Sequence, residues 1–359
     1  MSPRRLGFRY LALACLAASL ANAFHVSPVV AGESAKASVD PEAAARENWR
    51  SYMTHNPASE EGCFHASYPS YSWESVQCKV AAHPRFHPVP RKKKSFPEEV
   101  TGDRNDYVAQ TPTPITTAIG TFPSVTGVTS ETGVGVAAFG GGGILGANEY
   151  SLQINSNSND TTSVCASHSG CTVWEQFVYA PDYATEGEAA IFIESWLLGW
   201  GFTACPSGFE ADGQGDCVTN SSYASVPDEP ITSLGELSLT GSAYRGQSIL
   251  AGIKDSVTFS VGGTEISSVV ISDNIVEIRS VWNEAEFNVV GNAGGSEAVF
   301  NSGSSVTVLL SLIDNDLGTP SSVNCVAGAG TTGETNNLNL GTCTTTSGSE
   351  PTIEFTESN

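Results

Sequence analysis

The side chains that could carry acid–base chemistry in most of this chain are carboxylates and carboxamides, because histidine is nearly absent. Of the six histidines, five precede residue 106, and His168 alone follows, in a short loop between Cys165 and Cys171. A Ser-His-Asp or Cys-His mechanism would have to rest on that one residue, and no serine-nucleophile motif is present. The sequence therefore favours glutamate, aided by glutamine, as the group that could activate water.

The segment 172–179 alternates like a β-strand and carries one glutamate and one glutamine. Glu175 shares a face with apolar residues, whereas Trp174 and Gln176 take the opposite face. An earlier strand-like segment places Gln153 on a polar face of its own. A polar face that carries both glutamines beside a tryptophan would form the floor of a groove on a sheet.

The segment 190–198 places Glu194 between Phe192 and Trp196 on one face. Burial beside such side chains raises the pKa of a carboxyl group, which suits a general acid or a base that works at acid pH. The predicted catalytic residues are Glu194, Gln153, Gln176 and Glu175, and the predicted substrate-binding residues are Trp174 and Trp196.

A second acidic region, residues 282–297, offers Glu286 and Glu297 as further candidates. A simpler interpretation of the positions on the earlier strands, such as Gln153, Trp174 and Gln176, is that they are exposed polar residues on the outer face of an ordinary sheet, and it stays open here. Neither a CxxC nor an HExxH pattern is present, so we predict no metal and no other cofactor.

These segments belong to a body that begins near residue 106 and is rich in Gly, Ser, Thr, Val and Asn. Short alternating runs recur in it with turn residues between them, and helical periodicity is almost absent. Ten or more short strands in about 250 residues predict an all-β fold, a large antiparallel β-sandwich that is concanavalin-like or built of two packed β layers.

The N-terminal part differs in composition from this body. Residues 1–23 combine arginines, a short apolar run and small residues before Ala23, which is typical of a signal peptide. Residues 24–105 are basic and proline-containing, with one predicted helix over 41–54 and a small disulfide loop, and their basic cluster at 91–94 is a natural processing site. We predict a removable pro-segment over 24–105, a body over 106–359, and a secreted protein with no membrane span.

Cysteine usage agrees with export. Without Cys15, which lies in the predicted signal peptide, eight cysteines remain and fall into four local couples. An even set outside the cytoplasm indicates disulfides, although eight cysteines allow 105 connectivities. The predicted nearest-neighbour pairs are Cys63–Cys78, Cys165–Cys171, Cys205–Cys217 and Cys325–Cys343.

Charge is distributed very unevenly along the chain. Residues 106–359 hold 3 of the 16 basic and 28 of the 38 acidic residues, a formal charge of −25. Such a surface repels phosphate backbones, so nucleic acid is excluded as a partner. Mutual repulsion fades as carboxylates protonate, so we predict that the body is at least as stable near pH 4 as near pH 8. Plain solubility, or a high-salt habitat, would explain the same charge.

Several stretches resemble an uncharacterised family of secreted microbial β-rich proteins, and the likeness covers about residues 60–359. They are GCFHASYPSYSW, CTVWEQFVYAP, FIESWLLGW, EFNVVGNAGGSEAVFNSGS, TGETNNLNLG and TIEFTESN. The order of signal, basic pro-segment and acidic β body also resembles the glutamic peptidases, in which a Glu with a Gln, or two Glu, activate water. That resemblance implies that Gln153 or Gln176 polarises the scissile carbonyl, while Glu194 or Glu175 acts as base and then acid.

Two functions follow from these observations. The first is a secreted acid-adapted hydrolase, a peptidase of the glutamic type that acts on extracellular polypeptide. The second is a non-catalytic extracellular protein that binds glycan or a cell surface through aromatic side chains such as Trp174, Trp196 and Trp200.

Overall fold

The computed structural model describes residues 40–81, 101–102, 105–137, 141–246, 252–313 and 322–359. The predicted signal peptide and the basic cluster at 91–94 lie outside the described residues. Residues 41–359 form one unit. None of the described helices is long and apolar enough to cross a membrane.

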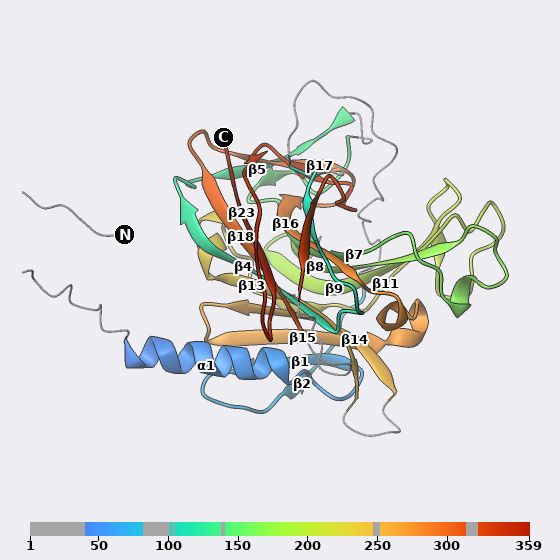
Figure 1. Cartoon of the computed structure of the whole chain (residues 1–359), viewed down its shortest axis with the longest axis horizontal. Coiled ribbons are helices and arrows are strands. Elements are labelled where there is room, and N and C mark those ends of the chain that lie inside the picture. The colour runs from blue at the N-terminus through green and yellow to red at the C-terminus, as the bar shows by residue number, and fades with distance from the viewer. Residues whose placement is uncertain (1–39, 82–100, 103–104, 138–140, 247–251, 314–321) are drawn as a thin grey trace, which may run out of the picture. The chain divides into compact units, whose positions relative to one another are not determined.

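Two large antiparallel sheets lie against each other, which confirms the predicted all-β sandwich (Figure 1). The first sheet has the order β2-β1-β15-β14-β13-β4-β18-β23-β21, with β22 paired to β23. Its strands are β1 (Gly62–Ser67), β2 (Glu74–Val76), β4 (Thr117–Thr126), β13 (Leu237–Arg245), β14 (Ile253–Val261), β15 (Glu265–Ser272), β18 (Ser305–Ile313), β21 (Asn339–Leu340), β22 (Thr344–Thr346) and β23 (Thr352–Ser358).

The second sheet has the order β10-β11-β9-β8-β7-β16-β3-β19, with β12 paired to β9. Its strands are β3 (Tyr107–Gln110), β7 (Tyr150–Ser156), β8 (Thr172–Thr185), β9 (Glu188–Leu198), β10 (Glu210–Ala211), β11 (Cys217–Asn220), β12 (Ala224–Val226), β16 (Glu284–Gly291) and β19 (Asn324–Ala327). A small third sheet joins β20 (Thr335–Asn336), β17 (Ser296–Phe300), β5 (Glu131–Gly135) and β6 (Gly146–Ala147). The helical elements whose bounds the structure describes in full are α1 (Pro41–His55) and the short 3-10 turns η2 (Ser163–Cys165), η3 (Ile231–Glu236), η4 (Asp273–Ile275) and η5 (Ile278–Ser280).

The core between the two large sheets depends on aromatic rings that meet glycines. Phe177 of β8 lies against Gly241 of β13, and Phe287 of β16 lies against Gly120 of β4. A Cβ atom at either glycine would overlap the facing ring. Glycine at these two positions therefore lets large side chains of the second sheet reach the backbone of the first.

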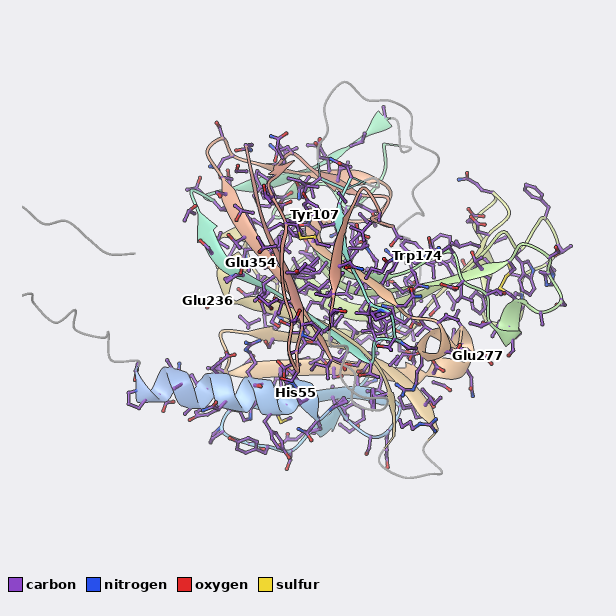
Figure 2. All side chains as sticks on the ribbon, in the orientation of Figure 1. His55, Tyr107, Trp174, Glu236, Glu277 and Glu354 are labelled. Carbon is purple, nitrogen blue, oxygen red and sulfur yellow. A yellow bond between two sulfur atoms is a disulfide. The ribbon has the colours of Figure 1, made fainter. Side chains whose placement is uncertain are left out.

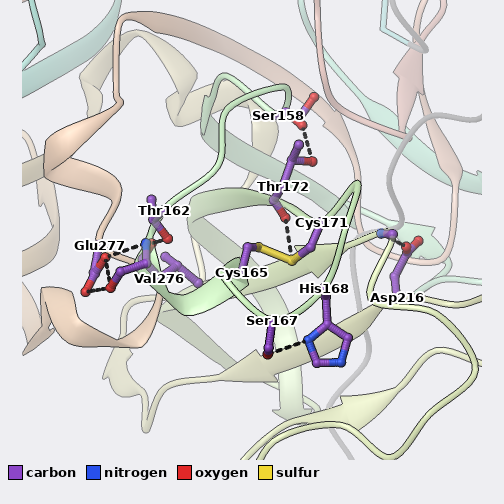
Figure 3. The surroundings of a disulfide bond; sticks show 12 residues. Ser158, Thr162, Cys165, Ser167, His168, Cys171, Thr172, Asp216, Val276 and Glu277 are labelled. Atoms are coloured by element: carbon purple, nitrogen blue, oxygen red, sulfur yellow. Dashed lines mark hydrogen bonds between the residues drawn. A yellow bond between two sulfur atoms is a disulfide. The ribbon is translucent and has the colours of Figure 1, made fainter.

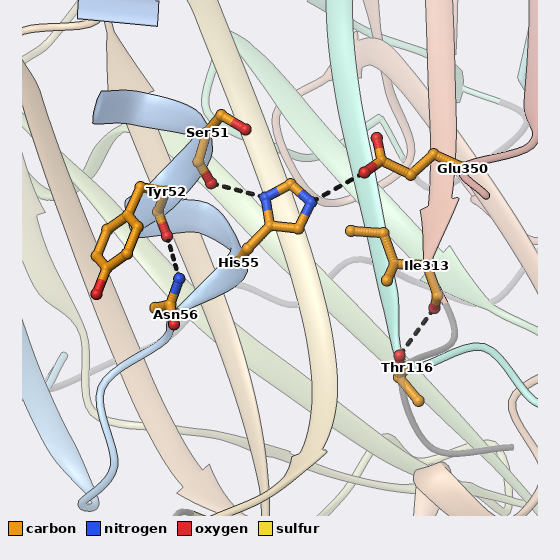
Figure 4. A network of polar contacts seen from close by, with 7 residues as sticks. All are labelled: Ser51, Tyr52, His55, Asn56, Thr116, Ile313 and Glu350. Atoms are coloured by element: carbon orange, nitrogen blue, oxygen red, sulfur yellow. Dashed lines mark hydrogen bonds and ion pairs between the residues drawn. The ribbon is translucent and has the colours of Figure 1, made fainter. Parts of the chain in front are cut away.

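Strands β1 and β2, near the start of the described chain, belong to the first sheet. Strand β1 pairs with β15 over six residues, and α1, which confirms the predicted helix, buries Trp49 and Met53 against Ala66 and Ile266. His55 at the end of α1 hydrogen-bonds through Nδ1 to the Ser51 carbonyl oxygen at 2.7 Å, and its Nε2 lies 3.3 Å from Glu350 Oε1 (Figure 4). Removal of residues 24–105 as a pro-segment stays a prediction.

The four predicted disulfides are all present. Cys63–Cys78, Cys165–Cys171, Cys205–Cys217 and Cys325–Cys343 join cysteines that are 15, 6, 12 and 18 residues apart. The nearest-neighbour pairing is therefore confirmed, and each bridge ties one local loop to the strands beside it.

Candidate functional site

A line of five polar side chains crosses the second sheet at right angles to its strands. The strand register pairs Glu286 of β16 with Asn155 of β7, Asn155 with Gln176 of β8, Gln176 with Glu194 of β9, and Glu194 with Asn220 of β11. We call these five residues the polar row. Because their neighbours in sequence on β7, β8 and β16 fill the core between the sheets, the polar row faces away from the first sheet.

Apolar side chains border the polar row on both sides along β8 and β9. On one side Trp174 and Trp196, whose ring centroids are 6.1 Å apart, pack with Val218. On the other side a group that we call the aromatic cluster is centred on Val178, Tyr183, Phe192 and Tyr223. The polar row is thus a narrow hydrophilic strip between two apolar surfaces, and Figure 2 shows Trp174 among the side chains of this region.

Gln153 lies two residues before Asn155 on β7 and therefore on the same face. Its Oε1 accepts hydrogen bonds from Thr332 Oγ1 at 2.9 Å and from Gln176 Nε2 at 3.2 Å. Its Nε2 donates to Ser151 Oγ at 2.9 Å. These partners hold the carboxamide in one orientation, since donors and acceptors would be mismatched if it were flipped.

Glu286 is held by the loop that precedes β20. Its Oε2 accepts hydrogen bonds from the backbone N–H groups of Thr331 at 2.7 Å and Thr332 at 3.1 Å, and from Asn155 Nδ2 at 3.2 Å. Its Oε1 has no hydrogen-bond partner among the described residues. The side chain is 1% exposed, and burial raises its pKa, although the hydrogen bonds to Oε2 act in the opposite direction.

The structure thus leaves one oxygen of a buried glutamate uncommitted. The same loop lies close to this oxygen, because Gly330 sits directly beside Glu286 Oε1 and Asp106 Cβ. A Cβ atom at position 330 would overlap both atoms.

Further carboxyl groups lie behind Glu286. Asn288 Nδ2 donates to Asp106 Oδ2 at 2.9 Å and to Glu357 Oε2 at 3.4 Å, and both carboxyl groups are fully buried. Burial raises the pKa of Glu357 to about 7. Burial, and then the charges of Glu286 and Glu357, raise the pKa of Asp106 well above its usual range. This part of the fold therefore holds several protons at acid pH.

The structure brings most of the predicted site residues together. Gln153, Gln176, Glu194, Trp174 and Trp196 share the outer face of the second sheet, and Glu194 Oε1 accepts a hydrogen bond from Trp196 Nε1 at 2.9 Å. They are all buried, with at most 2% exposure. The interpretation of these positions as exposed residues on an ordinary outer face is therefore wrong.

Glu175 does not join this group. It lies on the opposite face of β8, between the sheets, where its Oε1 accepts from Ser195 Oγ at 2.8 Å. Asp255 and Asp273 are its charged neighbours there. Glu297 lies on β17 in the third sheet. Neither is placed to act with Gln153.

His168 has a local role. Its ring stacks on Trp200 with a centroid distance of 3.4 Å, and Nδ1 is 3.0 Å from Ser167 Oγ, beside the Cys165–Cys171 bridge (Figure 3). In the part of the chain that the structure describes, no group of three or more His, Cys, Asp and Glu residues could hold a metal ion.

Sequence reasoning underrated Glu286 and missed Thr331 and Thr332. The alternation of Ala285, Phe287 and Val289 with polar residues was the available signal for Glu286. Nothing in the local sequence of the loop indicates that its backbone N–H groups face a strand more than forty residues earlier. Comparison of this chain with known protein families and with curated proteins found no match.

Proposed function

We propose that this protein is a secreted, acid-adapted peptidase of the glutamic type, in which Glu286 and Gln153 act on the cleaved bond. The observation that carries the proposal is their arrangement on the adjacent strands β16 and β7. Asn155 Nδ2 donates both to Glu286 Oε2 at 3.2 Å and to Gln153 Oε1 at 3.4 Å. Asn155 thereby links the buried Glu286 carboxylate to the buried Gln153 carboxamide. Glu286 Oε1 has no hydrogen-bond partner among the described residues.

In the proposed mechanism Glu286 is the general base. Its Oε1 takes a proton from a water molecule while the water oxygen attacks the scissile carbonyl carbon. Gln153 Nε2 donates to the carbonyl oxygen, which becomes the oxyanion of the tetrahedral intermediate. Glu286 then gives its proton to the amide nitrogen, the carbon–nitrogen bond breaks, and the carboxylate is restored.

The backbone N–H groups of Thr331 and Thr332 support both steps. They fix Oε2 and favour the charged carboxylate, whereas burial favours the protonated acid. A group under two opposed influences can accept the proton in the first step and release it in the second. Glu194, the glutamate that the sequence favours, is the fourth residue of the polar row, and Asn155 and Gln176 lie between it and Glu286.

The test compares Glu286→Gln with the matched variant Glu194→Gln. Purified full-length protein is assayed on unfolded protein substrates at pH 3–5, and its own N-terminus is followed for loss of residues up to about 94. We expect Glu286→Gln to abolish cleavage and Glu194→Gln to retain most of it, because each change keeps the side chain's shape and only Glu286 is the proposed general base.

Two results would contradict the proposal. Wild-type protein that cleaves none of a broad panel of proteins would refute the hydrolase function. An active Glu286→Gln variant beside an inactive Glu194→Gln variant would keep the function but move the base to Glu194. Circular dichroism and melting temperatures of both variants establish that each is folded.

A further inference from the structure

We infer that the aromatic cluster is a subsite that binds an aromatic side chain of a polypeptide substrate next to the cleaved bond. This inference rests on the peptidase function proposed above and names the substrate feature that the same site would select. The cluster starts directly beside Gln153, because Val178 of β8 is its cross-strand neighbour and Phe192 of β9 is the next residue in the same line. Adjacent strands are about 4.8 Å apart, so a side chain on the cluster lies within one residue of a carbonyl held by Gln153.

The geometry of the rings suits an aromatic guest. Tyr183 stacks on Phe192 with ring centroids 4.2 Å apart, and it meets Tyr223 edge-on at 5.5 Å. Asn220 Nδ2, at the end of the polar row, donates to the Tyr183 hydroxyl at 2.7 Å and fixes that ring. Rings in offset or edge-on arrangements attract a further ring beyond the simple burial of apolar area.

The chain itself shows how an extended polypeptide lies against this surface. Lys79 and Tyr223 exchange two backbone hydrogen bonds, from Lys79 N to Tyr223 O at 2.9 Å and from Tyr223 N to Lys79 O at 2.8 Å. Two residues later, the side chain of Ala81 packs against the aromatic cluster. Lys79 thus forms an isolated β-bridge with Tyr223, and the chain that follows it places an apolar side chain, Ala81, against the rings.

Lys79 and Ala81 belong to the segment 24–105 that the sequence predicts to be removed. A substrate strand could make the same two backbone hydrogen bonds to Tyr223, since such bonds are independent of sequence. Selectivity would then come from the side chain that takes the place of Ala81 against these rings, which are at most 6% exposed while residues 79–81 are in place.

The experiment maps cleavage sites in a complex peptide mixture at acid pH for the wild type and for two variants, Phe192→Ala and Phe192→Leu. In the wild type we expect Phe, Tyr and Trp to be enriched about tenfold over Ala at one position beside the cleaved bond. Phe192→Ala should abolish this enrichment, and Phe192→Leu, which keeps a large apolar side chain, should move it toward aliphatic residues. Val218→Ala, on the opposite side of the polar row, should keep the wild-type profile.

The outcomes separate the two proposals. A wild-type protein that cleaves nothing would refute the peptidase function itself. Cleavage without a preference for aromatic residues would overturn only the subsite. An unchanged cleavage profile in the Phe192→Leu variant would also overturn the subsite. The melting temperature of Phe192→Leu verifies that it is folded, so the test holds even if Phe192→Ala fails to fold.

Discussion

Replacement of Glu175 by glutamine should reduce the protein's loss of stability at alkaline pH. Glu175 is fully buried between the two large sheets, where Ser195 Oγ donates to Oε1 at 2.8 Å. Its Oε2 has no hydrogen-bond partner among the described residues. Burial raises the pKa of Glu175 to about 8, and the negative charge of Asp273 acts in the same direction, while the hydrogen bond from Ser195 opposes both.

The sign and the size of the pH effect on the free energy of unfolding follow from proton linkage. In the unfolded chain Glu175 loses its proton near pH 4.5, whereas the folded chain keeps it until about pH 8. Stability is therefore full below pH 4.5 and falls as the pH rises toward 8, because the unfolded state binds fewer protons. At 1.36 kcal/mol for each pH unit, the ceiling is on the order of 5 kcal/mol. Asp255 and Asp273 lie in the same region and titrate with Glu175, so we expect one substitution to recover half of this or less.

Urea unfolding of wild type and Glu175→Gln at pH 4 and pH 8 measures the effect. The wild type should lose stability between these pH values, and the variant should lose clearly less. Glu188→Gln is a control that should change the pH dependence of stability in the opposite direction, because hydrogen bonds from Lys79 and Ser225 lower the pKa of Glu188. Its substitution should weaken the fold slightly at pH 8 and leave it unchanged well below pH 4. Equal pH dependence in wild type and Glu175→Gln would refute the reasoning.

Two glycine substitutions test the packing around the site and the core. Gly330→Ala should lower both kcat of the proposed peptidase and the melting temperature, because the new Cβ would overlap the buried Glu286 Oε1 and lie 2.8 Å from Asp106 Cβ. Unchanged kinetics and melting temperature would contradict the placement of this loop. Gly241→Ala should cost about 1–3 kcal/mol in urea unfolding, since its Cβ would overlap the ring of Phe177, and a neutral effect would mean that the sheets can shift apart there.

The faces of the strands could be predicted from the sequence, because alternation depends on adjacent residues. The tryptophans and Gln176 lie on one face of their strands and Glu175 on the other, as predicted. The local disulfides follow for a similar reason, since each joins cysteines separated by 18 residues or fewer. Patterns of short range were sufficient for these features.

The register across the second sheet could not be predicted in the same way. Glu286 lies opposite Asn155, which is 131 residues earlier in the chain, and no local pattern determines which residues of two distant strands become neighbours. The sequence favours Glu194 as the catalytic carboxylate because large side chains flank it along the strand. The surroundings that matter for Glu286 come instead from β7 and from the loop at Thr331, so they exist only in the folded protein.

Interior carboxyl groups account for the proposed acid adaptation better than the surface charge that the sequence emphasises. Repulsion between exposed carboxylates is screened within about 8 Å at physiological salt, so it weakens as ionic strength rises. Burial raises the pKa of Glu131, Glu149 and Glu175 to about 8, and that of Glu357 to about 7. These groups are shielded from salt and must either keep their protons or ionise at a high cost in free energy. We therefore expect a fold that encloses so many carboxyl groups to be most stable at acid pH, where the proposed mechanism has Glu286 exchange a proton with a substrate. Stability and the proposed chemistry therefore depend on the same property of the interior.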